Sequence, residues 1–233
     1  DDFCINKKDV VRFCKKVVEE NFENLSFMSF CRASDATDEM FYWMKKANWR
    51  RLNIGIESFS QKVLREMGKR CTPKENHDAL KLAKKHGIQT FMNFIMTTPE
   101  TTLDDIQETV KGAKFYAEDS FYNAGITLAV KPLKGTDYFE EYTDYLTRIE
   151  KVPNSNYRLK IDEMIYSNDP KVKLLQNRYW NEIDDYITAE RERSDIRHGT
   201  ASNLALTKLN FFQKLVDEIK SLKKIDQYEA VGK

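Results

Sequence analysis

The chain has few cysteines and no long apolar run, and each shortage excludes a class of protein. Its cysteines, none of which forms a CxxC pair, are Cys4, Cys14, Cys31 and Cys71. Spacing this wide does not build a compact metal site, so we expect four reduced thiols and no metal held by the chain. No segment approaches the roughly 20 consecutive apolar residues that a membrane-spanning helix needs.

The chain also lacks an excess of charge of either sign. It has 38 basic and 37 acidic residues among 233, a net charge of +1. This balance gives no electrostatic reason to expect binding to nucleic acid or to an anionic membrane. Hydrophobic residues make up 41%, enough for a core. The chain begins at Asp1 with no signal peptide, and we expect a piece of a longer cytoplasmic protein.

Strand-like and helix-like segments alternate through the first 150 residues. Strands are expected at 25–31, 52–56, 88–96 and 125–130, and the helices between them have recognisable caps such as Thr72-Pro73-Lys74-Glu75. Strands separated by helices of crossover length favour parallel pairing in right-handed βαβ units. The sequence predicts an α/β fold, a partial TIM-like (βα) barrel of about four parallel strands with flanking helices.

A different pattern begins near residue 151. The remainder is expected to form helices at 170–193 and 201–224, and apolar residues from Phe211 to Leu222 share one helix face. We therefore predict a barrel part at 1–150 and a helical C-terminal extension at 151–233. Half a barrel exposes the edge of a parallel sheet, which dimerisation or folding of the extension over the edge would protect.

Polar residues follow the predicted strands, where a βα barrel places its catalytic groups. Arg32 follows one strand, Glu57 and Ser58 follow the next, and Asn93 lies on the third. A carboxylate such as Glu57 accepts hydrogen bonds from ribose hydroxyls or an ammonium group, and Gly55 would let a ligand approach the backbone. Arginine suits a carboxylate ligand. The plainer alternative is that Glu57 pairs with Arg32 and that Ser58 caps a helix.

Two other features have structural explanations. The segment Thr97-Thr98-Pro99-Glu100-Thr101 is typical of a proline turn followed by a helix cap. His77 and His86 lie on or beside one predicted helix, and we expect both to face solvent.

Taken in chain order, these residues resemble the radical S-adenosylmethionine (SAM) superfamily. Gly55-Ile56-Glu57-Ser58 is followed by a segment of the form LxxMGKR at 64–70. Residues 94–101 stand where the family has IMGLPGET, and residues 130–136 where it has xxPxPGT. The likeness covers about residues 1–145. It is strongest to the cobalamin-binding-domain subgroup, which includes the anaerobic magnesium-protoporphyrin IX monomethyl ester oxidative cyclase type.

The resemblance implies a parent enzyme that cleaves SAM at a [4Fe-4S] cluster to start radical chemistry on an unknown substrate. It implies that Glu57 and Ser58 contact the ribose or methionine part of SAM and that Arg32 reaches its carboxylate. The backbone near Phe94 would lie against adenine. The implied cofactor-binding set is Arg32, Gly55, Glu57, Ser58, Asn93, Phe94 and Met96. Cobalamin would be held by an upstream domain, and no catalytic residue is assigned.

The chain departs from the family in two respects. The CxxxCxxC motif that holds the cluster is absent, so we expect this fragment alone to be inactive. Thr97-Thr98-Pro99 also replaces Gly-Leu-Pro, which puts the close backbone approach of glycine in question. The main alternative is a non-catalytic α/β module that binds a nucleotide or a partner. A hydrolytic barrel enzyme with Glu57 as base has little support, because no paired acid or metal-ligand cluster accompanies it.

Overall fold

The computed structural model describes residues 3–22, 24–142, 146–147, 164–193 and 201–222. The barrel part contains α1 (Lys7–Glu19), β1 (Phe27–Cys31), the short helix η1 (Ala33–Asp35), α2 (Asp38–Lys46), β2 (Trp49–Glu57), α3 (Gln61–Glu66), α4 (Pro73–Lys85), β3 (Gln89–Thr97), α5 (Leu103–Ala117), β4 (Tyr122–Ala129) and α6 (Asp137–Tyr142). A two-stranded ladder follows, β5 (Leu146–Thr147) with β6 (Met164–Ile165), and then α7 (Pro170–Arg193) and α8 (Ala201–Ser221).

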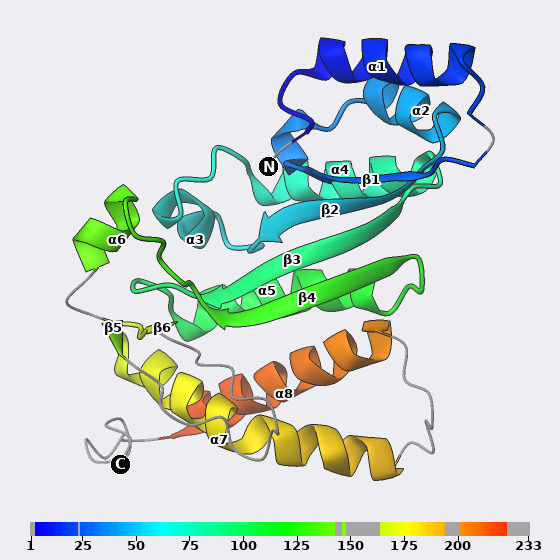
Figure 1. Cartoon of the computed structure of the whole chain (residues 1–233). Helices are drawn as coiled ribbons and strands as arrows, with labels where there is room; N and C mark the ends of the chain where they lie inside the picture. Colours follow the sequence, from blue (N-terminus) through cyan, green and yellow to red (C-terminus); the bar gives the residue numbers. More distant parts are fainter. Residues whose placement is uncertain (1–2, 23, 143–145, 148–163, 194–200, 223–233) are drawn as a thin grey trace.

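The four long strands form one parallel sheet in the order β1-β2-β3-β4 (Figure 1). Helices connect consecutive strands, as the crossover argument requires. The carboxyl ends of the strands therefore meet at one edge of the sheet, on the left in Figure 1, where α3 and α6 also lie. The predicted partial barrel of four parallel strands is confirmed.

Local sequence signals explain where the helices begin and end. The Thr72 hydroxyl accepts a hydrogen bond from the Glu75 amide, and the Glu75 carboxylate accepts one from the Thr72 amide, which completes a capping box at α4. Thr102 and Asp105 make the same reciprocal pair at α5. Gly87 ends the α4 turn with φ of +67°, a conformation that glycine adopts without steric cost.

The two faces of the sheet differ in burial. Leu52, Ile54 and Ile56 of β2 alternate with more exposed residues and are completely buried against the helix layer. On β3, Met92 and Phe94 face the same layer and are at most 1% exposed. Residues that point to the opposite face, such as Asn93, are half-buried. A barrel would enclose this open face, so it is the face that carries the candidate site.

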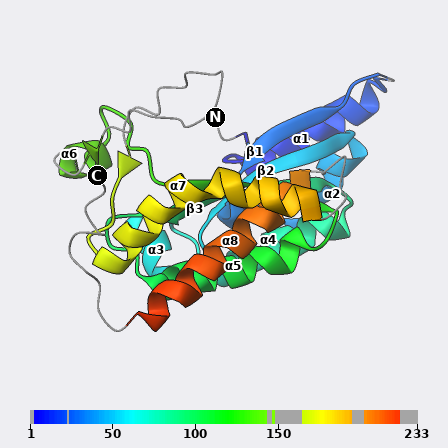
Figure 2. The same cartoon turned by 90° about the horizontal axis from the view of Figure 1, so that it is seen from below.

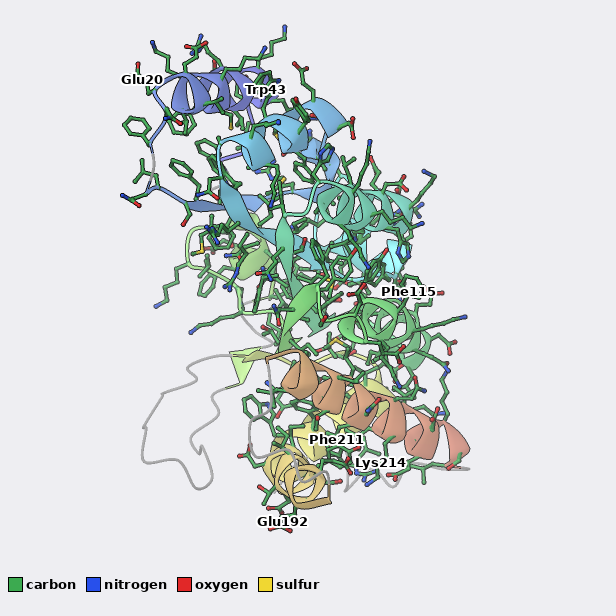
Figure 3. The ribbon with its side chains drawn as sticks, turned by 90° about the vertical axis from the view of Figure 1, so that its right-hand side faces the viewer. Glu20, Trp43, Phe115, Glu192, Phe211 and Lys214 are labelled. Carbon is green, nitrogen blue, oxygen red and sulfur yellow. The ribbon has the colours of Figure 1, made fainter. Side chains whose placement is uncertain are left out.

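The C-terminal extension lies beside β4. Helix α8 packs against α5 and β4 and against its neighbour α7 (Figures 1 and 2). Phe211 and Leu215 of α8 are buried at this junction, and Lys214 lies over the rings of Phe211 and Tyr186 (Figure 3). The helical extension is confirmed, and it shields the β4 side of the sheet. The boundary at residue 150 stays a prediction, because it falls outside the described residues.

The β1 side of the sheet remains apolar and open. Met28 is 64% exposed and Phe30 is 52% exposed on this strand. A groove of about 420 Å³ runs along it, lined by Phe3, Phe13, Phe27, Met28, Ser29, Phe30 and Trp49. The free edge of the partial barrel is therefore β1. Separately, none of the helices in the described ranges has the length and apolarity required to cross a membrane.

Gly112 in α5 gives a test of how tightly the helix layer packs. A Cβ atom at this position would overlap the ring of Phe59, which follows β2. We expect Gly112→Ala to destabilise the protein by about 1–2 kcal/mol, since overpacking outweighs the gain in helix propensity. Urea denaturation measures this difference. Lys111→Ala, at an exposed position of the same helix, should be nearly neutral. A stabilised Gly112→Ala protein would mean that the Phe59 ring has room to move.

Candidate functional site

The register of the three inner strands brings the candidate residues into one row. Gly55 of β2 pairs with Asn93 of β3, and Asn93 pairs with Gly125 of β4. The pairing then slips, because Glu57 instead of Ile56 lies opposite Phe94. Strand β2 thus carries one extra residue, a bulge that redirects the side chain that follows it.

Glu57 adopts an unusual backbone conformation at this bulge. Its φ is +59°, in the left-handed region that few non-glycine residues occupy. The Ser58 amide donates to the Ile56 carbonyl at 2.7 Å, which closes a tight turn around Glu57. The Glu57 carboxylate accepts a hydrogen bond from Lys69 Nζ at 3.0 Å. Lys69 belongs to the MGKR segment that follows α3, so the structure supplies a partner that the sequence-based alternative did not name.

The carboxylate occupies the space above Gly55. A Cβ atom on Gly55 would lie 2.6 Å from Glu57 Oε1 and 3.2 Å from Lys69 Nζ. The carboxylate therefore folds back over the strand, and a larger residue at position 55 would displace the ends of these two side chains. The room above Gly55 is thus taken by a side chain of this chain, beside the carboxyl edge of the sheet.

Ser58 turns inward, away from the open face. It is 1% exposed, and its hydroxyl lies 2.6 Å from that of Thr109 on α5. It also accepts a hydrogen bond from the Ser60 amide at 3.0 Å. The alternative that Ser58 caps a helix is wrong, since Ser60 is the N-cap residue of α3. A ligand contact by Ser58 stays a prediction, and its hydroxyl is already engaged in the protein.

Asp105 anchors the same turn from α5. The Ser60 hydroxyl donates to Asp105 Oδ1 at 2.5 Å, and Thr102 donates to Oδ2 through both its amide and its hydroxyl. Burial pushes the pKa of Asp105 upward, but these hydrogen bonds outweigh it and hold the pKa below its usual value. An ionised Asp105 therefore fixes the start of α3 to the start of α5.

The remaining predicted site residues lie at different depths. Arg32 is exposed directly after β1, at the same edge of the sheet as Glu57. The side chains of Phe94 and Met96 are at most 2% exposed and face the helix layer, so these two residues can offer only their backbone to the open side. The register therefore groups Gly55, Asn93 and Glu57.

The expectation that both histidines face solvent is wrong. The His77 ring stacks on Phe59 with centroids 4.5 Å apart, and its Nδ1 lies 2.7 Å from the Tyr116 hydroxyl. Burial lowers the pKa of His77. His86 lies 2.8 Å from Asp38, and its side chain is only 11% exposed. Both histidines contribute to packing between helices.

The two threonines that replace the family's glycine and leucine are completely buried. Thr97 donates its hydroxyl hydrogen to the Leu128 carbonyl at 2.8 Å and accepts a hydrogen bond from Gln176 Nε2 at 2.8 Å. Thr98 donates to Glu66 on α3, and its amide donates to the Thr101 hydroxyl. Their side chains are thus directed into the protein, and the loop is held by its own hydroxyl groups.

The C-terminal extension holds this loop from outside. The backbone amide of Asn168 donates to the Pro99 carbonyl at 2.7 Å. The Ser167 hydroxyl lies within 3.1 Å of the carbonyls of Pro99 and Thr101. Gln176 of α7 is fully buried and connects the parts, since it also donates to the Ile165 carbonyl and accepts from the Ser167 amide. The loop after β3 is therefore shared between the barrel part and the extension.

Two partly buried titratable side chains, Glu66 and Tyr138, lie next to the loop after β3. Burial raises the pKa of Glu66, although the Thr98 hydroxyl and the Glu100 amide both donate to it. Burial and the charge of Glu66 also raise the pKa of Tyr138 on α6. Among the atoms that the structure describes, the buried Tyr138 hydroxyl has no hydrogen-bond partner.

A metal cluster does not fit the described residues. Within the described ranges, no three histidine, cysteine, aspartate or glutamate side chains come together in a way that could hold a metal. The four cysteines are buried and none of them forms a disulfide. Burial and the neighbouring Cys4 raise the pKa of Cys14 to about 12, which opposes the thiolate form that binds metals.

Three important residues were not identified from the sequence. Lys69 lay within a quoted motif but received no role. Asn76 could have been found as a polar residue on the apolar stripe of α4, in helical spacing with Ala79, Leu80 and Ala83. Gln176 gives no comparable signal, because its partners lie up to 79 positions away along the chain.

The comparisons with known proteins agree with this arrangement. The family model described as Radical SAM superfamily matches residues 5–113. An uncharacterized methyltransferase of Pyrococcus horikoshii is 31% identical over 140 residues, which are 60% of this chain and 29% of that protein. The anaerobic magnesium-protoporphyrin IX monomethyl ester cyclase of Rubrivivax gelatinosus is 26% identical over 142 residues, 60% of this chain and 25% of that protein.

Among solved structures, this chain resembles the radical S-adenosylmethionine methyltransferase TsrM from Kitasatospora setae, whose structure holds cobalamin and a [4Fe-4S] cluster. The match has a TM-score of 0.58 and 11% identity, and covers 94% of this chain and 51% of that one. At this identity the likeness establishes the fold alone. The chain spans less than a third of the length of either curated relative.

Replacement of Gln176 tests whether the extension stabilises the loop. Gln176→Leu leaves Thr97, Ser167 and the Ile165 carbonyl without this buried partner. We expect a loss of about 2–4 kcal/mol in the free energy of unfolding, measured by urea denaturation. Gln213→Leu on α8, whose amide binds only Asp217, should change it by less than about 0.5 kcal/mol. Equal effects of the two substitutions would show that the loop does not depend on α7.

The raised pKa of Glu66 predicts a pH effect on stability. A carboxyl group whose pKa is higher in the folded state contributes stability below its unfolded pKa, about 4.3, and this contribution is lost as pH rises through the folded value. Glu66→Gln should therefore gain stability relative to the unmodified chain between pH 4 and pH 7. Denaturation at several pH values measures the difference. A value of ΔG of unfolding for Glu66→Gln minus that for the unmodified chain that stays constant or falls as pH rises over this interval would contradict a raised pKa.

Proposed function

Because residues 5–113 match the family model of the radical SAM superfamily, we propose that this chain forms the SAM-facing later part of a barrel whose parent enzyme cleaves SAM at a [4Fe-4S] cluster. The parent then performs radical chemistry on an unknown substrate. The observation that carries the proposal is the row Gly55–Asn93–Gly125, with Glu57 redirected by the bulge at its carboxyl end. Parallel barrels use this end for cofactors and catalysis.

The chain's residues fit the adenosine part of SAM. The Glu57 carboxylate lies at the site edge, 3.0 Å from Lys69 Nζ, and can accept hydrogen bonds from ribose hydroxyls. Asn93 presents an amide beside it on the open face. The open face of β3 offers a surface for the adenine ring, and Arg32 is exposed directly after the carboxyl end of β1. When bound, SAM supplies the radical chemistry, while these residues bind and orient it.

The cluster and cobalamin belong to other parts of the parent. Because the described residues supply no ligand set for a cluster, we propose that a CxxxCxxC segment about 30–50 residues upstream of Asp1 supplies it, a distance of one βαβ unit. The cobalamin bound in the TsrM structure supports an upstream cobalamin-binding domain in the parent. A cytoplasmic location of the parent is part of the same proposal.

Dimerisation of this chain through the barrel edge stays a prediction, and we propose the β1 side for it. Helix α8 packs on β4, whereas Met28 and Phe30 leave the β1 side apolar and exposed. A second copy would therefore meet this chain along β1 and the groove beside it.

The parent protein, with its upstream segment, gives the direct test. After anaerobic reconstitution with iron and sulfide we expect the brown absorbance of a four-iron cluster and cleavage of SAM under reduction. In this protein Glu57→Gln should weaken SAM binding about tenfold, since it removes a charged hydrogen-bond acceptor. Equilibrium binding measures the change. Glu108→Gln, at an exposed position of α5, is the matched control and should bind SAM normally.

A parent protein that stays colourless after reconstitution and does not cleave SAM would contradict this proposal. That outcome would favour a non-catalytic α/β module whose strand-end residues hold a nucleotide or a partner.

A further inference from the structure

We infer that Asn76 is a positioning residue for Glu57: its buried amide holds the backbone on both sides of Glu57 so that the carboxylate stays at the site edge. Asn76 lies in the first turns of α4 and is completely buried. Its Nδ2 donates to the Ile56 carbonyl at 3.1 Å and to the Ser58 carbonyl at 3.0 Å. The functional meaning of this contact rests on the proposed function.

The two carbonyls are the ones that flank Glu57. The Ile56 carbonyl also accepts the Ser58 amide at 2.7 Å, so both of its lone pairs are used within this turn. The left-handed φ of +59° at Glu57 is unfavourable for any residue with a Cβ and persists only where surrounding contacts enforce it. Asn76 provides such contacts from a rigid helix.

The side-chain oxygen of Asn76 indicates that the two Nδ2 hydrogen bonds explain why an asparagine lies at this buried position. Among the atoms the structure describes, Asn76 Oδ1 is buried and has no hydrogen-bond partner, an arrangement that is costly in a protein interior. Neighbouring positions on this helix face, Ala79 and Leu80, are apolar. Rotation of the amide would set Oδ1 against two carbonyl oxygens, so its orientation is determined. The two Nδ2 hydrogen bonds to the turn at Glu57 offset the cost of burying the unpaired Oδ1 atom.

The consequence for the site follows from the geometry above Gly55. With the turn held, the Glu57 carboxylate lies over this glycine and 3.0 Å from Lys69. Without Asn76, position 57 is able to relax toward an extended conformation. The carboxylate then leaves the edge where the ribose hydroxyls of SAM are proposed to lie.

A binding comparison tests this role without any turnover. The 233-residue chain is titrated by NMR with adenosine and with 2′,3′-dideoxyadenosine, which lacks both ribose hydroxyls. We expect adenosine to bind about tenfold more tightly to the unmodified chain, the size of one charged hydrogen bond. Asn76→Leu should reduce this ratio to about one, as should Glu57→Ala. Leu80→Ala is the control, because it weakens the same helix without touching the turn and should keep the ratio.

The outcomes separate the two proposals. A ratio that survives in Asn76→Leu but is lost in Glu57→Ala overturns the inference and leaves the proposed function standing. A ratio of one in the unmodified chain contradicts the role of Glu57 in ribose binding, which is part of the proposed function. The contact between Asn76 and the turn is then decided by a second measurement that needs no ligand.

That measurement compares the loss of thermal stability on Asn76→Leu in two backgrounds. A glycine adopts the left-handed conformation without steric cost, so in a Glu57→Gly background the held turn is no longer strained. We expect the fall in melting temperature to be at least halved there. Falls of equal size in both backgrounds would overturn the inference. Asn76→Ala, which introduces no bulk, serves in the same comparison if Asn76→Leu fails to fold.

Discussion

The extra residue that β2 carries opposite β3 is the constraint on which the candidate site depends. In an uninterrupted parallel pair, Glu57 would lie opposite Ile95 and point along the regular alternation of the strand. The bulge instead places it opposite Phe94 in a left-handed conformation. Three contacts follow from this irregularity. The displaced Glu57 carboxylate lies over Gly55 and pairs with Lys69. The amide of Asn76 holds the backbone beside it.

Most of the fold could be predicted because its signals are local. The capping boxes at Thr72 and Thr102 depend on residues three positions apart, and the apolar alternation of β2 and β3 requires only neighbouring residues. Boundaries were less exact: β2 begins at Trp49 and β4 at Tyr122, three residues earlier than expected in each case. Pairing with a neighbouring strand extends β2 through Arg50 and Arg51 and β4 through Asn123 and Ala124, residues that have little strand preference of their own.

The site could be predicted only in part, because its details depend on contacts between distant positions. The sequence places Glu57 at a strand end and Asn93 on the next strand, and parallel pairing brings these strands together. It does not show that Ser58 turns toward Thr109, since a bulge changes which face a residue meets. The choice of Lys69 over Arg32 as the partner of Glu57 likewise depends on the path of the turn after α3.

The contact between Thr97 and Gln176 has a consequence for how such proteins diversify. The extension follows the barrel part in the chain, yet its inner face supplies hydrogen-bond partners to the loop after β3. A foreign extension grafted onto this barrel would remove the hydrogen bond that the buried Thr97 hydroxyl accepts, unless it also brought an amide to the same place. The hydroxyl would keep only its bond to the Leu128 carbonyl, so an exchange of extensions has to preserve the pair of positions 97 and 176.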